Sequence, residues 1–516
     1  MTTMRERLNA LPLARLRAIR RGIEKESLRA LPSGGLALTP HPSALGSALT
    51  HPKITTDFSE SQLELITGAF VGVDDCLAEL TEIHQATYHA IGDEQLWVGS
   101  MPCGLPTDET IPLGRYGASN VGRAKSVYRM GLGHRYGRRM QTISGIHYNW
   151  SMPGLGNDEH FALIRNFRRN AFVLLYLFGA SPAVCGDFVA GRGHDLQALP
   201  GGKSGTLHRP HGTSLRMGRL GYQSDAQASI AVSYNSLESY ANSLHGALVT
   251  PYPAYEAVGI RNPGGDYNQL ATSLLQIENE FYGLIRPKRV IQPGERPLHA
   301  LRERGVEYIE VRCLDLDPFV PEGITAQTAR FIDVFLLHCL LADSPNDTPA
   351  EIAALGRNQH RVAERGREPG LLLERGDQQV GLLGWAGELL ADYAPIAAAL
   401  DAANESTLYS EALAHAQAML AQPDQLPSAR VMARMRDGFD NSYVKFMRVQ
   451  SAQTRERFLG LPWSDAQAER YAAMAQNSVA EQRRIEAADT MPFEQYRVAY
   501  LSPDRLEVRG RVGLAA

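Results

Sequence analysis

The chain has 516 residues, of which 44% are hydrophobic and 21% charged, as in a globular protein long enough to bury a core without disulfides or metal staples. Its 52 lysines and arginines against 56 aspartates and glutamates give a formal net charge of −4, which argues against nucleic-acid binding through bulk positive charge. The five cysteines lie far apart with no CxxC pair, so they indicate neither a disulfide framework nor a structural zinc site, and they fit a reducing compartment.

The N-terminal segment is rich in arginine and predicts one amphipathic helix from Met4 to Arg20. A transit peptide has a similar composition. We favour the helix, because the residues from Gly22 onward are candidate catalytic residues that need an upstream anchor. The longest apolar stretch, Ala171–Cys185, contains glycine, serine and proline and falls short of the roughly 20 residues that a membrane span needs. It predicts a buried helix that ends near Gly179, and we expect no membrane span.

Strand and helix patterns alternate through the first part of the chain. A hairpin is expected around Pro32–Gly35, between the segments GIEKESLRAL and SGGLALTP. Further patterns predict strands at Ser61–Thr67, Arg139–Trp150 and Gly305–Leu314, and helices at Val73–Gly92 and Val121–Tyr136. Residues 186–214 are rich in glycine, proline and histidine, and we expect long loops there.

After about residue 325 the patterns are almost entirely helical. The expected helices are 325–343, 348–366, 380–402, 408–421, 427–450 and 465–488. Ser464, with Gln467 three residues later, has the signature of a capping box at the start of the last of them. The sequence therefore predicts an α+β chain in which residues 1–325 form the catalytic region. Residues 326–516 are expected to form a helical region packed on it as a single structural unit.

Carboxylates recur within predicted strands. Glu24 and Glu26 are two residues apart and therefore point to the same face of a strand. Three further carboxylates lie in comparable runs: Asp57, Glu64 and Glu310. A single acidic pair of this kind is usually a solvated strand face, and each motif taken alone leaves that alternative open. Several together favour a binding site, because a carboxylate between apolar neighbours is costly unless it is paired or bound to metal.

One histidine, His147, lies in another predicted strand, where a hydrogen-bonded core histidine is the alternative. Oxygen-rich clusters with one imidazole suit Mg²⁺ or Mn²⁺. Arg312 is expected on the same strand face as Glu310, and metals combined with arginines are typical of phosphoryl transfer. The run Gly202–Ser204 lacks the earlier glycine of a P-loop, so an ATP site would have to be a metal-bridged face of a sheet.

Eight motifs stand in order between about residue 19 and residue 345: GIEKESLR, HPSALGSALTHPKITTDFSESQLELIT, SMPCGLP, MQTISGIHYNW, LFGASPAVC, TSLRMGRLGY, LLQIENEFYGLIRPKR and GVEYIEVRCLDLDPF. Together they closely resemble the glutamate–cysteine ligases of the proteobacterial type, which catalyse the first step of glutathione synthesis. The resemblance continues weakly in the helical third, through GREPGL and EAADTMPF.

The resemblance implies a fold like the catalytic domain of glutamine synthetase, with an antiparallel sheet that forms a funnel. It places the metal ligands at Glu24, Glu26, Asp57, Glu64, His147 and Glu310. The arginines that bind phosphate and the transition state fall on Arg129, Arg216 and Arg312. The pocket for cysteine falls on Phe58, Tyr128, Leu132, Tyr222 and Tyr282, and aromatic walls with phenol hydroxyls suit a small amino acid with one thiol.

The implied enzyme is a cytoplasmic, monomeric, ATP-dependent ligase that uses Mg²⁺ or Mn²⁺ and acts on L-glutamate, L-cysteine and ATP. Neither nucleic acid nor membrane is an expected partner, and glutathione is an expected feedback inhibitor. Two alternatives stay open: a related ligase that joins glutamate to another amine, and a non-catalytic regulatory protein that binds Mg²⁺ or nucleotide. Two interpretations also stay open for three basic residues, which either contact nucleotide or glutamate or are surface charges: Arg286, Lys288 and Arg289.

The chain departs from the family pattern between Pro153 and Leu163, where it is about a dozen residues shorter. The family can pair the cysteine after SMP with one in that segment. Cys103 has no such partner here, so we expect no disulfide. Three other cysteines lie in apolar helical patterns and are expected to be buried thiols: Cys76, Cys185 and Cys339.

Overall fold

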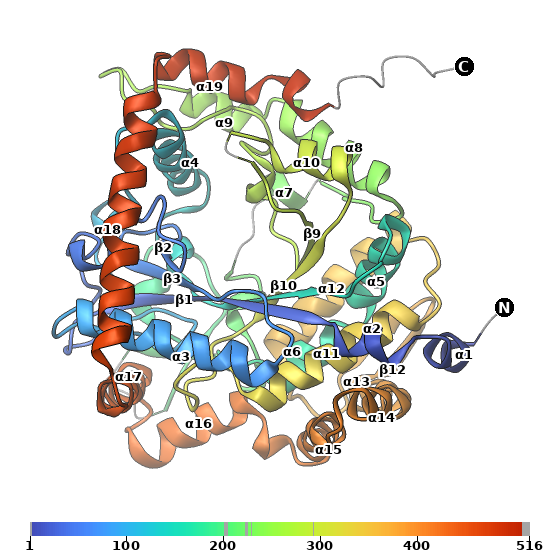
Figure 1. Ribbon diagram of the computed structural model, residues 1–516. Helices are drawn as coiled ribbons and strands as arrows, with labels where there is room; N and C mark the ends of the chain where they lie inside the picture. The colour runs from blue at the N-terminus through green and yellow to red at the C-terminus, as the bar shows by residue number, and fades with distance from the viewer. Residues whose placement is uncertain (1–2, 201–204, 222–224, 229, 293, 508–516) are drawn as a thin grey trace, which may run out of the picture.

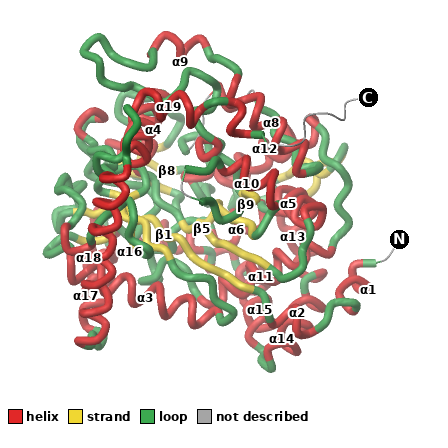
Figure 2. The backbone as a smooth tube through the Cα atoms, turned by 45° about the horizontal axis from the view of Figure 1, so that its top comes forward, coloured by secondary structure: helices red, strands yellow, loops and turns green. Residues whose placement is uncertain are grey.

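The computed structural model describes residues 3–200, 205–221, 225–228, 230–292 and 294–507. A seven-stranded sheet runs through its centre (Figures 1 and 2). The strands follow the order β2 (Ile54–Thr56), β3 (Gln62–Ile66), β1 (Arg20–Ala30), β5 (Ile146–Ser151), β10 (Tyr308–Leu314) and β9 (Ile285–Lys288), with β4 (Gln95–Leu96) paired to the end of β1. All neighbouring strands are antiparallel, which confirms the predicted antiparallel sheet.

One face of this sheet, here called the back face, carries the alternate apolar side chains of the strands, including Ile23, Leu65 and Ile309. It is covered by α3 (Val73–Ala90) and α11 (Ala326–Leu341), which lie below the sheet in Figure 1. Burial of one such aliphatic side chain contributes roughly 1.5–3 kcal/mol, so this apolar layer stabilises the packing of the sheet on the helices.

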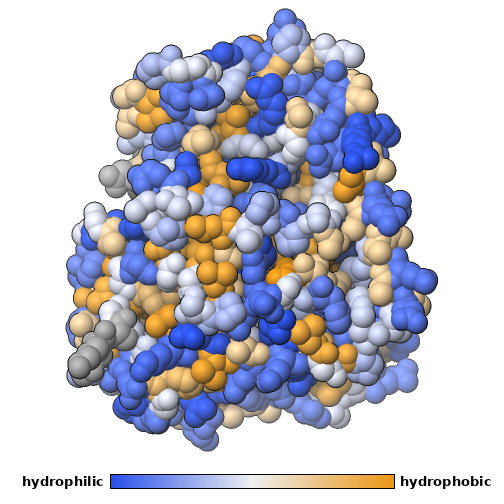
Figure 3. All heavy atoms as spheres, turned by 90° about the vertical axis from the view of Figure 1, so that its left-hand side faces the viewer, coloured by the Kyte–Doolittle hydropathy of each residue, from blue (hydrophilic) through white to orange (hydrophobic). Residues whose placement is uncertain are grey.

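The opposite face, here called the front face, is bordered by helices that stand around it. They include α4 (Asn120–Tyr136), α10 (Pro297–Arg304) and α19 (Phe493–Leu501), above the sheet in Figure 1. Along one side, α18 (Asp465–Ala488) runs from α17 (Tyr443–Gly460) to α19. On that side of the molecule, polar and apolar side chains are interspersed (Figure 3).

The helical character of the C-terminal third is confirmed, with breaks that the sequence pattern did not reveal. The helices are α11, α12 (Pro349–Arg365), α13 (Leu382–Asp392), α14 (Ala394–Asn404), α15 (Leu408–Ala421), α16 (Pro427–Gly438), α17, α18 and α19. The helix expected at 427–450 is two helices, because Asp440 and Asn441 have φ values of 52° and 57° and end the first one. The capping box of Ser464 and Gln467 at the start of α18 is present.

The single helix predicted at Met4–Arg20 is wrong. The segment forms α1 (Met4–Asn9) and α2 (Leu13–Arg17), because Pro12 between them lacks the backbone N–H that would continue the first helix. Strand β1 then begins at Arg20.

Two other predicted elements are present only in part. The turn after β1 forms, but its second arm makes only one bridge, between Ala30 and Leu36. The strand predicted at 139–150 begins at Ile146, after a short 3₁₀ turn. The buried helix expected before Gly179 is confirmed as α6 (Phe172–Phe178), which follows α5 (Asn157–Asn170).

Two expectations for the cysteines are wrong: that Cys103 forms no disulfide and that Cys185 is a buried thiol in a helix. Cys103 forms a disulfide with Cys185, whose Cα is 5.2 Å away. Cys185 lies in the short strand β6 (Ala183–Cys185) rather than in a helix, and β6 pairs with β8 (Thr206–His208) inside the segment expected to be loops. The buried free thiols of the described residues are Cys76, Cys313 and Cys339.

Among the helices of the described residues, none is both long and apolar enough to span a membrane.

Candidate active site

The candidate metal ligands meet on the front face because strand register places them opposite one another. Glu24 in β1 pairs with His147 in β5, and Glu26 pairs with Glu64 in β3. The Nδ1 atom of His147 lies 3.3 Å from Glu24 and 3.8 Å from Glu310, and its Nε2 atom lies 3.7 Å from Glu26. One ligand atom each from Glu24, Glu64 and His147 lie within 4.8 Å of one another. Four carboxylates from three strands therefore surround one imidazole.

The charges in this cluster are unevenly balanced. Glu310 has cationic neighbours, because Lys288 Nζ lies 3.3 Å away and Arg312 Nη1 lies 3.1 Å away. Burial alone would raise the pKa of Glu310, but these two cations outweigh it and hold that pKa well below its usual value. Burial raises the pKa of Glu64 well above its usual value, and the neighbouring Glu24 carboxylate adds to the rise. A cation placed near Glu64 would thus relieve a repulsion that the protein leaves in place.

The donor set fits a hard divalent cation. Carboxylate oxygens with one imidazole suit Mg²⁺ or Mn²⁺. Asn149, on the same face two residues after His147, donates from Nδ2 to Glu24 at 2.8 Å, while its own Oδ1 is buried without a hydrogen-bond partner among the described residues. Sequence reasoning missed Asn149, although the same two-residue spacing that selected the glutamates points to it. Asp57, at the end of β2, lines the same cavity as Glu64.

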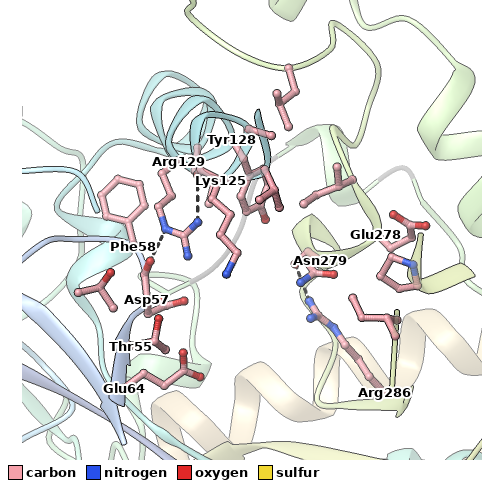
Figure 4. A pocket seen from close by; sticks show the side chains of 18 of the residues that line it. Thr55, Asp57, Phe58, Glu64, Lys125, Tyr128, Arg129, Glu278, Asn279 and Arg286 are labelled. Carbon is pink, nitrogen blue, oxygen red and sulfur yellow. Dashed lines mark hydrogen bonds between the residues drawn. The ribbon is translucent and has the colours of Figure 1, made fainter. Parts of the chain in front are cut away.

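A cavity of about 370 Å³ opens above the carboxylates. In Figure 4, Asp57, Phe58 and Glu64 line one side, Lys125, Tyr128 and Arg129 of α4 line another, and Asn279 and Arg286 face them. Four of the five residues predicted for the cysteine pocket line this cavity: Phe58, Tyr128, Leu132 and Tyr282. The fifth, Tyr222, lies outside the described residues. The structure thus brings the predicted cysteine pocket and the acidic cluster into one space.

The three predicted arginines lie on two walls of the site. Arg129 of α4 stacks on the ring of Tyr116, 4.5 Å from its centre, and donates to the carbonyl oxygen of Asp57. Arg216 and Arg312 line a smaller cavity of about 60 Å³ beside His147, and Arg216 Nη2 donates to the carbonyl oxygen of Arg312 at 3.0 Å. Two guanidinium groups therefore lie together on one side of the imidazole, and the third lies on α4.

The Arg216 side chain packs closely against the backbone just before β5. It lies against the backbone of Gly145, at a distance where any Cβ on that residue would collide with the guanidinium group. The glycine in the motif that precedes His147 therefore makes room for this arginine.

The turn that carries Arg216 is held from two sides. Asp315 accepts hydrogen bonds from Ser214 Oγ at 2.9 Å and from Ser181 Oγ at 2.6 Å. From α12, Gln359 Nε2 donates to the carbonyl oxygen of Met217 at 3.0 Å. Gln359 also lines the smaller cavity, so the helical third contributes a residue to the site that sequence reasoning missed.

The three basic residues at the end of β9 and directly after it have different surroundings. Arg286 and Lys288 line the main cavity, and Arg286 Nη2 donates to the carbonyl oxygen of Asn279 at 2.8 Å. Arg289 instead donates to the carbonyl oxygen of Gly305 at 3.1 Å and does not line that cavity.

Residues 7–362 match the family model of glutamate–cysteine ligase. The chain is 47% identical over 515 residues to the glutamate–cysteine ligase of Alcanivorax borkumensis, covering 96% of this chain and 97% of that relative. It is also 47% identical over 497 residues to the glutamate–cysteine ligase of Pseudomonas entomophila, covering 93% of each chain.

Solved structures are similar to this chain over most of its length. The crystal structure of glutamate–cysteine ligase from Francisella tularensis in complex with AMP matches with a TM-score of 0.88 and 35% identity, over 94% of this chain and 97% of that one. The bifunctional glutathione synthetase from Pasteurella multocida shares the fold, with a TM-score of 0.69 and 24% identity over 90% of this chain and 57% of that one. The chain belongs to the glutamate–cysteine ligase family, and it is an ATP-dependent ligase that forms γ-glutamylcysteine in the first step of glutathione synthesis.

Proposed function

We propose that the cavity on the front face is where this enzyme joins the γ-carboxylate of glutamate to the amine of cysteine. The observation that carries the assignment is that one cavity is lined both by the acidic cluster and by the apolar and phenolic residues predicted to hold cysteine. An oxygen of the γ-carboxylate attacks the γ-phosphorus of ATP, and the bond from that phosphorus to ADP breaks. The amine of cysteine then attacks the γ-glutamyl phosphate, phosphate leaves, and the amine loses a proton.

The acidic residues would hold Mg²⁺ or Mn²⁺, and we propose all six as ligands: Glu24, Glu26, Asp57, Glu64, His147 and Glu310. When bound, the metal screens the repulsion between the carboxylate and the triphosphate. Arg216 and Arg312 are placed to donate hydrogen bonds to the phosphoryl oxygens on one side, and Arg129 is placed to do so from α4. Such donors are most effective where charge develops in the transition state.

The predicted cysteine pocket supplies shape and neutral hydrogen-bond donors. Burial raises the pKa of Tyr128 well above its usual value, and it raises that of Tyr282 as well. Both phenols therefore keep their protons at neutral pH. The hydroxyl of Tyr282 accepts a hydrogen bond from Gln141 Nε2 at 2.9 Å, which orients the ring at the wall of the cavity.

The alternative within the same chemistry is a ligase that joins glutamate to a different amine. The test is ADP release from ATP and glutamate with a panel of amino acids and amines, each with Mg²⁺ and with Mn²⁺. We expect cysteine to give the highest kcat/KM. A different best amine would overturn the substrate assignment, and ATP binding without amine-dependent ADP release would favour a non-catalytic binding protein.

Residues 1–325 are proposed as the catalytic region and residues 326–516 as a helical region packed on it in one structural unit. The hydrogen bond from Gln359 to the Arg216 turn supports this arrangement. We further propose a cytoplasmic monomer that glutathione inhibits and that binds neither nucleic acid nor membrane. Supply of ATP and of the free thiol substrate supports the cytoplasmic location.

A further inference from the structure

A buried ion pair lies behind the walls of the predicted cysteine pocket. Arg135 Nη1 and Glu280 Oε1 are 2.8 Å apart, and both side chains are 0% exposed. Neither residue lines the cavity. Arg135 is on α4, the helix that presents Tyr128 and Leu132, whereas Glu280 lies two residues before Tyr282. The ion pair therefore joins the two walls of the pocket without entering the space between them.

The guanidinium group of Arg135 is bound on every side. Its Nε and Nη2 atoms donate to Gln269 Oε1 at 3.1 and 2.9 Å, and Nη2 also donates to the carbonyl oxygen of Ala271 at 2.6 Å. The ring of Tyr255 lies over the group, with its centre 3.9 Å from the guanidinium carbon. These contacts allow one orientation of the side chain.

The carboxylate of Glu280 extends the network to the pocket wall. It accepts hydrogen bonds from the hydroxyl of Tyr136 at 2.7 Å and from the backbone N–H of Gln276 at 2.8 Å. The side chain of Gln227 donates to the Tyr136 hydroxyl at 2.9 Å and accepts from the backbone N–H of Tyr282 at 3.1 Å. The ring of Tyr136 packs edge-on against that of Tyr282, with centres 5.6 Å apart. Glu280 is thus connected to Tyr282 both through hydrogen bonds and through ring packing.

The same segment is also fixed directly to α4. Gln276 Nε2 donates to the carbonyl oxygen of Tyr128 at 3.3 Å. Its side-chain amide lies so close to Gly131 that a Cβ there would collide with it. The backbone of the segment therefore approaches the helix at the turn that presents Tyr128 and Leu132.

Buried ion pairs are seldom the most stable way to fill a core, since apolar residues of similar size are often equally stable or more so. What a fully bonded pair adds is one defined geometry, because any shift of either wall would leave a charge unpaired. We propose that Arg135 and Glu280 are positioning residues that fix the distance between α4 and the Tyr282 segment. They thereby set the selectivity of the pocket for the thiol side chain of cysteine. This inference rests on the proposed function.

Three variants test it: Glu280→Gln, the double variant Arg135→Met/Glu280→Gln, and Tyr136→Phe. For each, kcat and KM are measured with cysteine and with 2-aminobutyrate, in which a methyl group replaces the thiol, and KM is measured for ATP and glutamate. With the first two variants we expect KM for cysteine to rise about tenfold, and the cysteine-to-aminobutyrate ratio of kcat/KM to fall about tenfold. KM for ATP should stay within about twofold. Tyr136→Phe should shift the ratio in the same direction by less.

The matched control is Asp333→Asn, which breaks another buried ion pair, between Arg21 and Asp333, with side chains 3% and 0% exposed. It should lower the melting temperature and leave KM for cysteine unchanged. Unchanged KM and unchanged selectivity in the folded double variant would overturn the inference. If neither variant of Glu280 folds, Tyr136→Phe decides in the same way, because it removes one hydroxyl and no charge. A wild-type enzyme that prefers another amine would instead overturn the proposed function.

Discussion

The two faces of the central sheet bury charged side chains in opposite ways. On the back face, Arg21 Nη2 lies 2.9 Å from Asp333, which also accepts a hydrogen bond from the hydroxyl of Tyr148 at 2.9 Å. Lys25, also on the back face, lies 2.7 Å from Nε2 of His84 in α3. Arg21 is thus paired with a carboxylate, whereas Lys25 lies against an imidazole nitrogen and burial lowers its pKa.

On the front face, the same strand β1 presents Glu24 and Glu26 into a group in which carboxylates predominate. Burial raises the pKa of Glu26, which shows that the nearby positive charge does not compensate this carboxylate fully. The back face thus holds its buried cations against a carboxylate or an imidazole, whereas the front face keeps an excess of carboxylates. This excess is what the proposed metal site requires.

The largest expected effect is a loss of activity on the front face. Arg312→Ala removes one proposed transition-state donor and should lower kcat by about 10²-fold, or roughly 3 kcal/mol. Glu24→Ala should be at least as severe, because it removes a proposed metal ligand. Both proteins should retain the wild-type circular dichroism spectrum. Near-normal turnover in either variant would show that the site is assigned wrongly.

A large effect on stability is expected on the back face. Asp333→Asn leaves the buried charge of Arg21 without its partner, and such a loss typically costs about 3–5 kcal/mol in the free energy of unfolding. Urea unfolding would measure it, and kcat of the folded fraction should stay close to the wild-type value. A severe loss of kcat with unchanged stability would mean that the two faces do not divide the roles as described.

A smaller effect should appear in the pH dependence of stability. Burial lowers the pKa of Lys25 from 10.5 to about 7. Between these values the unfolded chain holds a proton that the folded chain lacks, so this residue makes stability rise with pH by up to about 1.4 kcal/mol per unit. Lys25→Met removes the contribution. The unfolding free energy of wild type minus that of the variant should therefore increase between about pH 7.5 and about pH 9. A constant difference would mean that Lys25 stays protonated in the folded protein.

The residues of the front-face cluster could be predicted from the sequence, because side chains two residues apart in a strand point to the same face. The register of the antiparallel strands then brings these residues together. Glu24 and Glu26 were visible as a pair, and the structure places His147 opposite Glu24. The back-face pairs were not visible in the same way. Lys25 stands between the two glutamates and finds its partner on a helix that the sequence pattern does not connect to it.

Other features depend on long-range packing that no local pattern encodes. The partners Cys103 and Cys185 are 82 residues apart, and the ion pair of Arg135 and Glu280 joins residues that are 145 apart. The break of the first helix at Pro12 could have been predicted, since proline lacks the N–H that an interior helical position donates. The leucines at positions 8, 11, 13 and 16 nevertheless favour one continuous helix, because they fall on one helical face.

We propose that the front-face carboxylates bind a divalent cation, whereas the back-face charges stabilise the fold. The most direct test is Mn²⁺ binding, measured by electron paramagnetic resonance, for wild type, Glu64→Gln and Asp333→Asn. We predict that wild type and Asp333→Asn bind Mn²⁺ equally well and that Glu64→Gln binds it at least about tenfold more weakly. Equal affinity in wild type and Glu64→Gln would show that Glu64 does not bind the cation, and an equal loss in Asp333→Asn would show that the two faces do not differ in this role.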